Sequence, residues 1–219
     1  MIVRPKFTAL VLSIAALSLV LFVCGCDRSA LRIPGASLPF PDSPTGYAAK
    51  ATYPHALVVS NPVDQRAQHY GERVAGTKWT GGANDALWSM DATQIVQQRL
   101  LREFRTSGLF SKVSTVSTSP DDIVVKTEIH AFCSQAVGFL IARVAGITSL
   151  RVTMEQHGRI LLDRKFEKVV TDADKEYTGS QVTFIEQAMR VTMADSLREL
   201  VRDVLEQTEA EANSWQRPM

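Results

Sequence analysis

The sequence is poor in the residues that mark a disulfide scaffold, a metal site or a nucleic-acid-binding surface. It has only three cysteines among 219 residues, and Cys24 and Cys26 lie so close together that they cannot build a disulfide framework or a zinc site. None of the four histidines stands at the spacing of paired metal ligands. The 24 basic residues nearly balance the 23 acidic ones, which leaves no basic field for a phosphate backbone. We therefore expect no metal, no cofactor and no nucleic-acid partner.

Catalytic signatures are missing as well. The sequence contains no Gly-x-Ser-x-Gly elbow and no phosphate-binding or dinucleotide-binding glycine motif. The adjacent Asp121 and Asp122 follow a Ser-Pro step, which is typical of a solvated turn. Asp172, Asp174 and Glu176 lack the glycine and the distal glutamate of a calcium-binding EF-hand loop. No set of acid, base and nucleophile can be assembled, so the sequence predicts a protein that is not an enzyme.

The first 25 residues have the composition of an export signal. Arg4 and Lys6 give a short positive start, and the run from Phe7 to Gly25 carries no charge. An apolar segment after a positive start is the pattern of a secretory signal, because that segment must enter the membrane. The alternative is an uncleaved membrane anchor, since about 20 apolar residues suffice for a helix that spans a bilayer.

The residues that end this run resemble a bacterial lipobox. Val23 supplies the branched apolar residue three positions before Cys26, Gly25 supplies the small residue directly before it, and the thiol of Cys26 would accept a diacylglycerol group. Cys24 does not fit that role, because the bulky Val23 directly precedes it. We therefore predict a signal peptide over residues 1–25 and lipidation at Cys26.

Lipidation would place the chain in the cell envelope, anchored in a membrane and facing the periplasm. Cleavage of the leader removes two basic residues and no acidic one, so the mature chain does not hold an anionic membrane through lysine and arginine. Acyl chains provide that hold instead. Asp27, the residue after the modified cysteine, favours the inner membrane by its likeness to retention signals of enteric lipoproteins, and the choice between the two membranes stays open.

Proline content divides the rest of the chain. Five of the nine prolines lie between residues 27 and 55, where no apolar periodicity is sustained. Proline stiffens the chain and removes backbone donors, so we predict a tether over residues 26–55 that could reach up to about 80 Å from the membrane. An α+β periplasmic domain is predicted over residues 56–208, followed by a disordered tail over residues 209–219.

Within the domain, alternating and helical apolar patterns predict a two-layer sandwich, in which two helices pack on one face of a mostly antiparallel sheet. The predicted strands cover residues 56–60, 110–116, 123–132, 150–156 and 159–170, and the predicted helices cover residues 85–107 and 183–208. Gly108 stands where a helix C-cap glycine is expected. His157-Gly158 marks a hairpin turn between the last two strands.

The segment from Gln135 to Ile147 is apolar without clean alternation and leaves two interpretations open. It is either a buried strand or a partly exposed surface that contacts a partner subunit or lipid. The candidate contact residues are Phe139, Leu140, Ile141 and Val144. Cys133, just before this segment, is predicted to be a buried thiol that packs as a small apolar side chain, with pairing to a second copy as the alternative.

Several short motifs together are similar to the ABC-type transport auxiliary lipoproteins of Gram-negative envelopes. These motifs span nearly the whole mature chain. They are the lipobox at Cys26, Leu57-Val58-Val59, Val63-Asp64-Gln65-Arg66 with His69-Tyr70, Trp79, Leu100-Leu101, Gly108-Leu109-Phe110-Ser111-Lys112-Val113, Phe132, the strands around Gly158 and the last amphipathic helix. The chain departs from the family pattern after Trp79, where Thr80-Gly81-Gly82 replaces an acidic-proline step.

The resemblance implies a non-catalytic accessory that docks onto an envelope ABC-type transport system, in this family often one that moves lipid. Its expected partners are the membrane, through the N-terminal lipid, the transporter subunits and further copies of the chain. The alternative is a structural lipoprotein of another envelope assembly or of a secretion apparatus.

Overall fold

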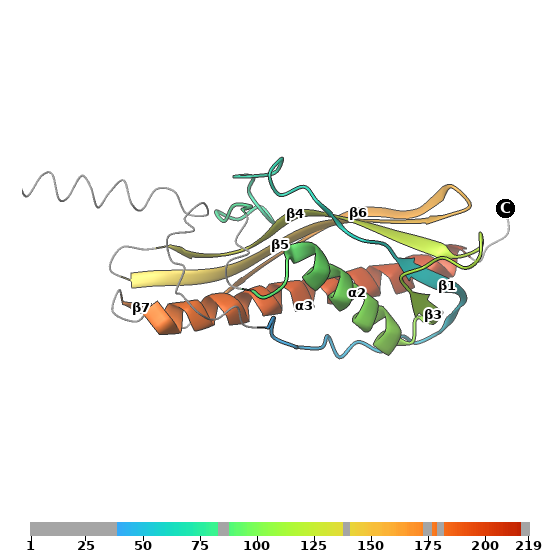
Figure 1. The fold of residues 1–219 in the computed structure, drawn as a ribbon, viewed down its shortest axis with the longest axis horizontal. Helices are drawn as coiled ribbons and strands as arrows, with labels where there is room; N and C mark the ends of the chain where they lie inside the picture. Colours follow the sequence, from blue (N-terminus) through green and yellow to red (C-terminus); the bar gives the residue numbers. More distant parts are fainter. Residues whose placement is uncertain (1–38, 83–87, 138–140, 173–176, 179–181, 216–219) are drawn as a thin grey trace, which may run out of the picture.

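The computed structural model describes residues 39–82, 88–137, 141–172, 177–178 and 182–215 (Figure 1). Its elements, in chain order, are β1 (Tyr53–Val59), β2 (Val63–Asp64), α2 (Ala92–Ser107), β3 (Phe110–Ser114), β4 (Ile123–Val137), β5 (Ile141–Gln156), β6 (Arg159–Thr171), β7 (Tyr177–Thr178) and α3 (Val182–Trp215). No helix among the described residues is both long enough and apolar enough to span a bilayer.

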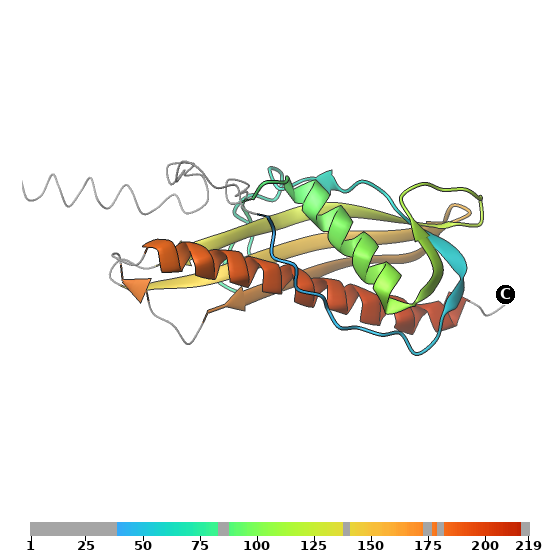
Figure 2. The same ribbon diagram turned by 60° about the horizontal axis from the view of Figure 1, so that its bottom comes forward.

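The strands form one mixed sheet in the order β3-β1-β4-β5-β6. The long strands β4, β5 and β6 are antiparallel to each other, whereas β1 runs parallel to both β3 and β4. β2 pairs with β4, and β7 pairs with β5. Both α2 and α3 lie on the same face of this sheet (Figure 2). The predicted two-layer α+β sandwich is confirmed.

Local signals account for the shorter helix. Asp91 is the N-cap of α2, and its carboxylate accepts a hydrogen bond from the backbone N–H of Gln94 at 2.8 Å. The sequence predicts an earlier start, near residue 85, but residues 83–87 are outside the described part. Gly108 ends the helix with φ of 70°, a left-handed conformation that suits glycine. The apolar stripe on the buried face contains Ile95, Val96, Leu100 and Phe104.

The hairpin strands are longer than the sequence predicts. The predicted strand over 123–132 continues to Val137, and the strand predicted to begin at Leu150 begins at Ile141. Residues 133–135 and 144–149 of these extensions are buried on both faces of the sheet, which hides the alternation of a strand with one wet side. The two-residue turn His157-Gly158 is confirmed, with φ of 51° and 74°.

α3 lies unusually close to β5 at one point. The backbone carbonyl oxygen of Thr192 would stand 2.1 Å from a Cβ placed on Gly146, which is well inside contact distance. Next to this contact, the hydroxyl groups of Thr148 and Ser196 share a hydrogen bond of 2.7 Å inside the core. The absence of a side chain at Gly146 therefore sets how closely the helix can approach the sheet.

The C-terminal end differs from the prediction of a disordered tail over residues 209–219. α3 continues to Trp215, and residues 216–219 are outside the described part. Ala212 is buried, and the indole of Trp215 stands edge-on to the ring of Tyr53 with 5.6 Å between ring centroids. These residues extend the buried helical stripe at spacings of three and four, so tertiary packing holds a segment whose composition alone predicts fraying.

Candidate docking site

The described chain begins with a segment that crosses both helices. Residues 39–52, here named the N-terminal strap, form no helix or strand and run over α2 and α3 to reach β1 (Figure 2). Cys26, the predicted lipidation site, and residues 27–38 lie outside the described part. The sequence predicts a tether over residues 26–55, but the part from Pro39 onward is packed on the domain and adds nothing to the reach.

The start of the strap is held by aromatic contacts. The ring of Phe40 packs against Trp88, with 4.7 Å between centroids, and against Phe132, with 5.9 Å. Arg190 of α3 donates a hydrogen bond to the carbonyl oxygen of Pro39 at 3.1 Å, and its guanidinium also lies over the ring of Trp88. The strap thus joins the hydrophobic core at its first described residues.

The middle of the strap is held by a buried ion pair on α2. Arg99 and Glu103 are both almost fully buried, and their side chains approach to 3.4 Å. Arg99 donates hydrogen bonds to the strap carbonyl oxygens of Pro41 and Ser43. The other carboxylate oxygen of Glu103 accepts hydrogen bonds from the hydroxyl and the backbone N–H of Thr45, at 2.6 and 3.1 Å. Each charge is therefore paired and each also binds the strap.

The ionisation of Glu103 depends on these contacts. Burial by itself would raise the pKa of its carboxyl group, but the hydrogen bonds from Thr45 and Arg102 outweigh burial and hold this pKa below its usual value of 4.5. A carboxyl whose pKa is lowered by folding stabilises the folded state above its unfolded pKa. That stabilisation is lost as the pH falls through the folded pKa, so the strap contacts persist at neutral pH.

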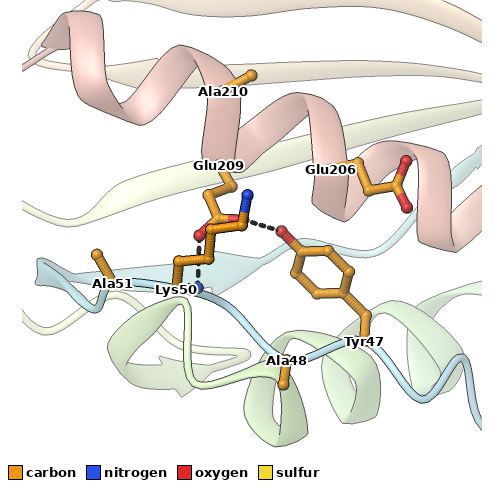
Figure 3. A pocket seen from close by; sticks show the side chains of 7 residues that line it. All are labelled: Tyr47, Ala48, Lys50, Ala51, Glu206, Glu209 and Ala210. Carbon is orange, nitrogen blue, oxygen red and sulfur yellow. Dashed lines mark hydrogen bonds between the residues drawn. The ribbon is translucent and has the colours of Figure 1, made fainter.

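The end of the strap forms an open cavity of about 450 Å³ with the C-terminal part of α3 (Figure 3). It is lined by Tyr47, Ala48, Lys50, Ala51, Glu206, Glu209 and Ala210. Glu209 accepts hydrogen bonds from the hydroxyl group of Tyr47 and from the backbone N–H of Lys50, the latter at 2.6 Å. Burial and then the hydrogen bond to Glu209 raise the pKa of the Tyr47 phenol, so this hydroxyl remains a donor at neutral pH.

The candidate contact residues of the 135–147 segment do not form the predicted surface in the described part. Phe139 and Leu140 lie outside the described residues. For Ile141 the backbone alone is described, and it pairs with Thr178. Val144 is fully buried in a small cluster with Tyr177 and Ala188, so its prediction as a surface contact is wrong. The strand faces α3 there, and the helix covers this side chain.

The same end of the molecule nevertheless exposes large apolar side chains. Val137 at the end of β4 is 52% exposed, and Phe184 and Val191 on α3 are 60% and 49% exposed. Phe184 and Val191 stand seven residues apart on α3, which places them on one side of the helix. We name these three residues the distal apolar group, because α3 begins and β7 lies at this end (Figure 1).

The opposite face of the sheet carries a loop, residues 65–82, here named the outer loop. Its Val74 and Trp79 pack on a second apolar cluster formed by Ala131, Cys133, Ala145 and Ile147. Cys133 is buried, as predicted. The motif resemblance pointed to Trp79 but gave no indication that a loop covers this face.

The histidines of the described part contact neighbouring side chains and do not gather into a metal-binding group there. No group of three or more His, Cys, Asp or Glu side chains in this part of the chain is placed to hold a metal ion. His157 pairs with Asp121 at 2.7 Å on the surface, and His55 contacts Gln156. His69 and His130 stack on each other across the outer loop and the sheet. Sequence analysis missed this pair, because no local pattern joins two residues so distant in the chain.

No family model matches the chain, and the comparison with curated proteins found no relative. Solved structures with a similar chain path include a protein of the DUF330 family from Xanthomonas campestris, at 15% identity and a TM-score of 0.48, with 80% of this chain and 92% of that chain covered. A minor lipoprotein from Acinetobacter baumannii gives 10% identity and a TM-score of 0.46, covering 73% of this chain and 94% of its own. Rare lipoprotein B from Shewanella oneidensis gives 8% identity and a TM-score of 0.39, with 74% of this chain and 100% of that chain covered. Two of these three similar proteins are thus named as lipoproteins.

Proposed function

We propose that the chain is a lipid-anchored protein of the Gram-negative envelope that serves as a non-catalytic docking subunit of an ABC-type transport system. The lipobox at Cys26 and the motif resemblance support the anchor and the transport system. The observation that carries the docking role is the N-terminal strap, which fixes the domain to its anchored end through the buried pair Arg99 and Glu103.

The strap limits how far the domain stands from the membrane. Pro39 follows Cys26 by 13 residues, and such a segment spans at most about 45 Å when fully extended. The contact between Pro39 and Arg190 puts the end of this span on α3, in the same half of the helix as Phe184 and Val191. A domain held within this short distance of the membrane suits docking onto a membrane-embedded partner better than capture of a distant one.

The anchor is tested by the intact mass of the protein extracted from membranes. We expect the wild type to lack residues 1–25 and to carry a diacylglyceryl group, because Cys26 supplies the only thiol that fits the lipobox. Cys26→Ser should keep the whole leader, and the matched control Cys24→Ser should be processed like the wild type. An unprocessed mass in all three proteins would establish an uncleaved anchor and overturn the proposal.

The docking role is tested by photo-crosslinking in cells from the distal apolar group. We expect crosslinkers at Val137 and Phe184 to capture a permease or a substrate-binding subunit, because exposed apolar side chains mark interaction surfaces. Ile160 at the opposite end, beside the His157-Gly158 turn, is equally exposed at 56% and serves as the control. Capture of an outer-membrane barrel or a secretin would favour the structural alternative, and crosslinks to the chain itself would indicate an oligomer.

A further inference from the structure

Two histidines stack face to face between the outer loop and the sheet. The ring centroids of His69, in the outer loop, and His130, on β4, lie 3.8 Å apart, and the ring planes differ by 19°. His130 is only 8% exposed. Its Nε2 atom is 3.2 Å from the carboxylate of Glu128, and the Nδ1 atom of His69 is 3.0 Å from that of Glu72.

The second ring nitrogen of His130 lacks a partner. Among the described residues, Nδ1 of His130 is buried and makes no hydrogen bond. His130 also lines a cavity of about 10 Å³, which has room for one water molecule at most. Burial without a hydrogen-bond partner penalises the charged form of an imidazole, so this site favours the neutral ring of His130.

Charged groups of both signs surround the pair on three of the neighbouring segments. The outer loop contributes Glu72 and Arg73, β4 contributes Glu128, and β6 contributes Lys165, whereas β5 contributes the neutral Ser149. Lys165 forms an ion pair with Glu167, which also accepts a hydrogen bond from the backbone N–H of Ala75. The carboxylate of Glu72 contacts the more exposed His69. Positive charge on both rings would lie at stacking distance, with Lys165 nearby.

We propose that His69 and His130 form a pH-sensitive latch, which holds the outer loop on the sheet while one ring is neutral and releases it when both are protonated. Two imidazolium rings at stacking distance repel each other, and this repulsion acts between the loop and the strand that it covers. The released loop uncovers Trp79 and Cys133, which are buried in the closed form.

The sign of the pH dependence follows from the burial of His130. Burial chiefly, together with His69 and Lys165, lowers the pKa of this imidazole below its ordinary 6.5 against the raising effect of Glu128. The open form therefore binds protons more readily than the closed one. The closed form is fully stable above about pH 6.5 and loses stability as the pH falls from there towards the lowered pKa.

Hydrogen exchange of the full-length protein in detergent tests the latch. After correction for intrinsic exchange rates, we expect the amides of residues 70–82 to exchange faster at about pH 5.5 than at about pH 7.5 in the wild type. The increase should be up to about tenfold for one histidine, because its ordinary pKa of about 6.5 in the open form lies about one unit above the lower pH. His69→Gln should weaken this increase, because the repulsion between two charged rings is lost while the burial of His130 remains. His157→Gln, which alters an exposed histidine at the far end of the sheet, should behave like the wild type.

Two outcomes would overturn the latch. One is an exchange rate in the wild type that does not change with pH, and the other is an increase that persists undiminished in His69→Gln. If His69→Gln opens the loop at both pH values, Glu72→Gln decides. Loss of that carboxylate removes a negative charge beside the pair, so the increase in exchange at about pH 5.5 should be larger than in the wild type. An increase no larger than that of the wild type in Glu72→Gln would again contradict the proposal.

Discussion

Replacing Gly146 by alanine should lower the free energy of unfolding by about 3 kcal/mol or more, since overpacking of a well-packed core costs about 1–3 kcal/mol and backbone atoms cannot rotate out of the way. The added Cβ would lie 2.1 Å from the carbonyl oxygen of Thr192 and 2.4 Å from the backbone nitrogen of Met193. α3 would have to move away from β5 and so disturb the hydrogen bond between Thr148 and Ser196. Urea unfolding followed by circular dichroism measures the change.

The control for this substitution is Gly46→Ala in the N-terminal strap. Gly46 has φ of 67°, and a Cβ added to it would have no heavy atom within 4 Å, so alanine there meets backbone strain alone. That strain costs about 1–2 kcal/mol. Equal losses for the two substitutions would show that α3 yields easily at Gly146, and would contradict the close approach of helix and sheet as a determinant of stability.

Replacing Glu103 by alanine should cost about 3–5 kcal/mol of stability, because it leaves the guanidinium of Arg99 buried without its partner. Arg99 and Glu103 are 4% and 1% exposed, so solvent cannot replace the missing carboxylate. The substitution also removes the acceptor of both Thr45 hydrogen bonds. We therefore expect the strap amides near Thr45 to exchange faster than those of the sheet, in addition to a lower unfolding midpoint.

Asp42→Ala provides the matched control for Glu103→Ala. Asp42 also pairs with an arginine of α2, Arg102, but 72% of its side chain is exposed. Exposed pairs contribute about 0–1 kcal/mol, so this variant should keep both its stability and the slow exchange of the strap. A Glu103→Ala protein as stable as Asp42→Ala would mean that the strap is not clamped by the buried pair, and would remove the observation on which the docking role depends.

Local patterns in the sequence were sufficient for the helices, most strands and the turn between β5 and β6. The apolar stripe from Ile95 to Phe104 and the C-cap Gly108 can be predicted from the sequence, because they depend only on neighbours three and four residues away. The turn His157-Gly158 is likewise a property of two adjacent residues. The absence of catalytic and metal-binding motifs is also a property of the sequence, and so is the prediction of a leader over residues 1–25.

Tertiary structure decided where these elements meet and what covers them. A proline-rich segment becomes the N-terminal strap only because Arg99 and Glu103 on α2 lie under it. The C-terminal residues stay helical because Tyr53 receives Trp215. The parallel position of β1 and the stacking of His69 on His130 join residues that lie far apart in the chain. Periodicity shows that a face is buried, but the partner that buries it is chosen by packing in three dimensions, and no local pattern encodes that choice.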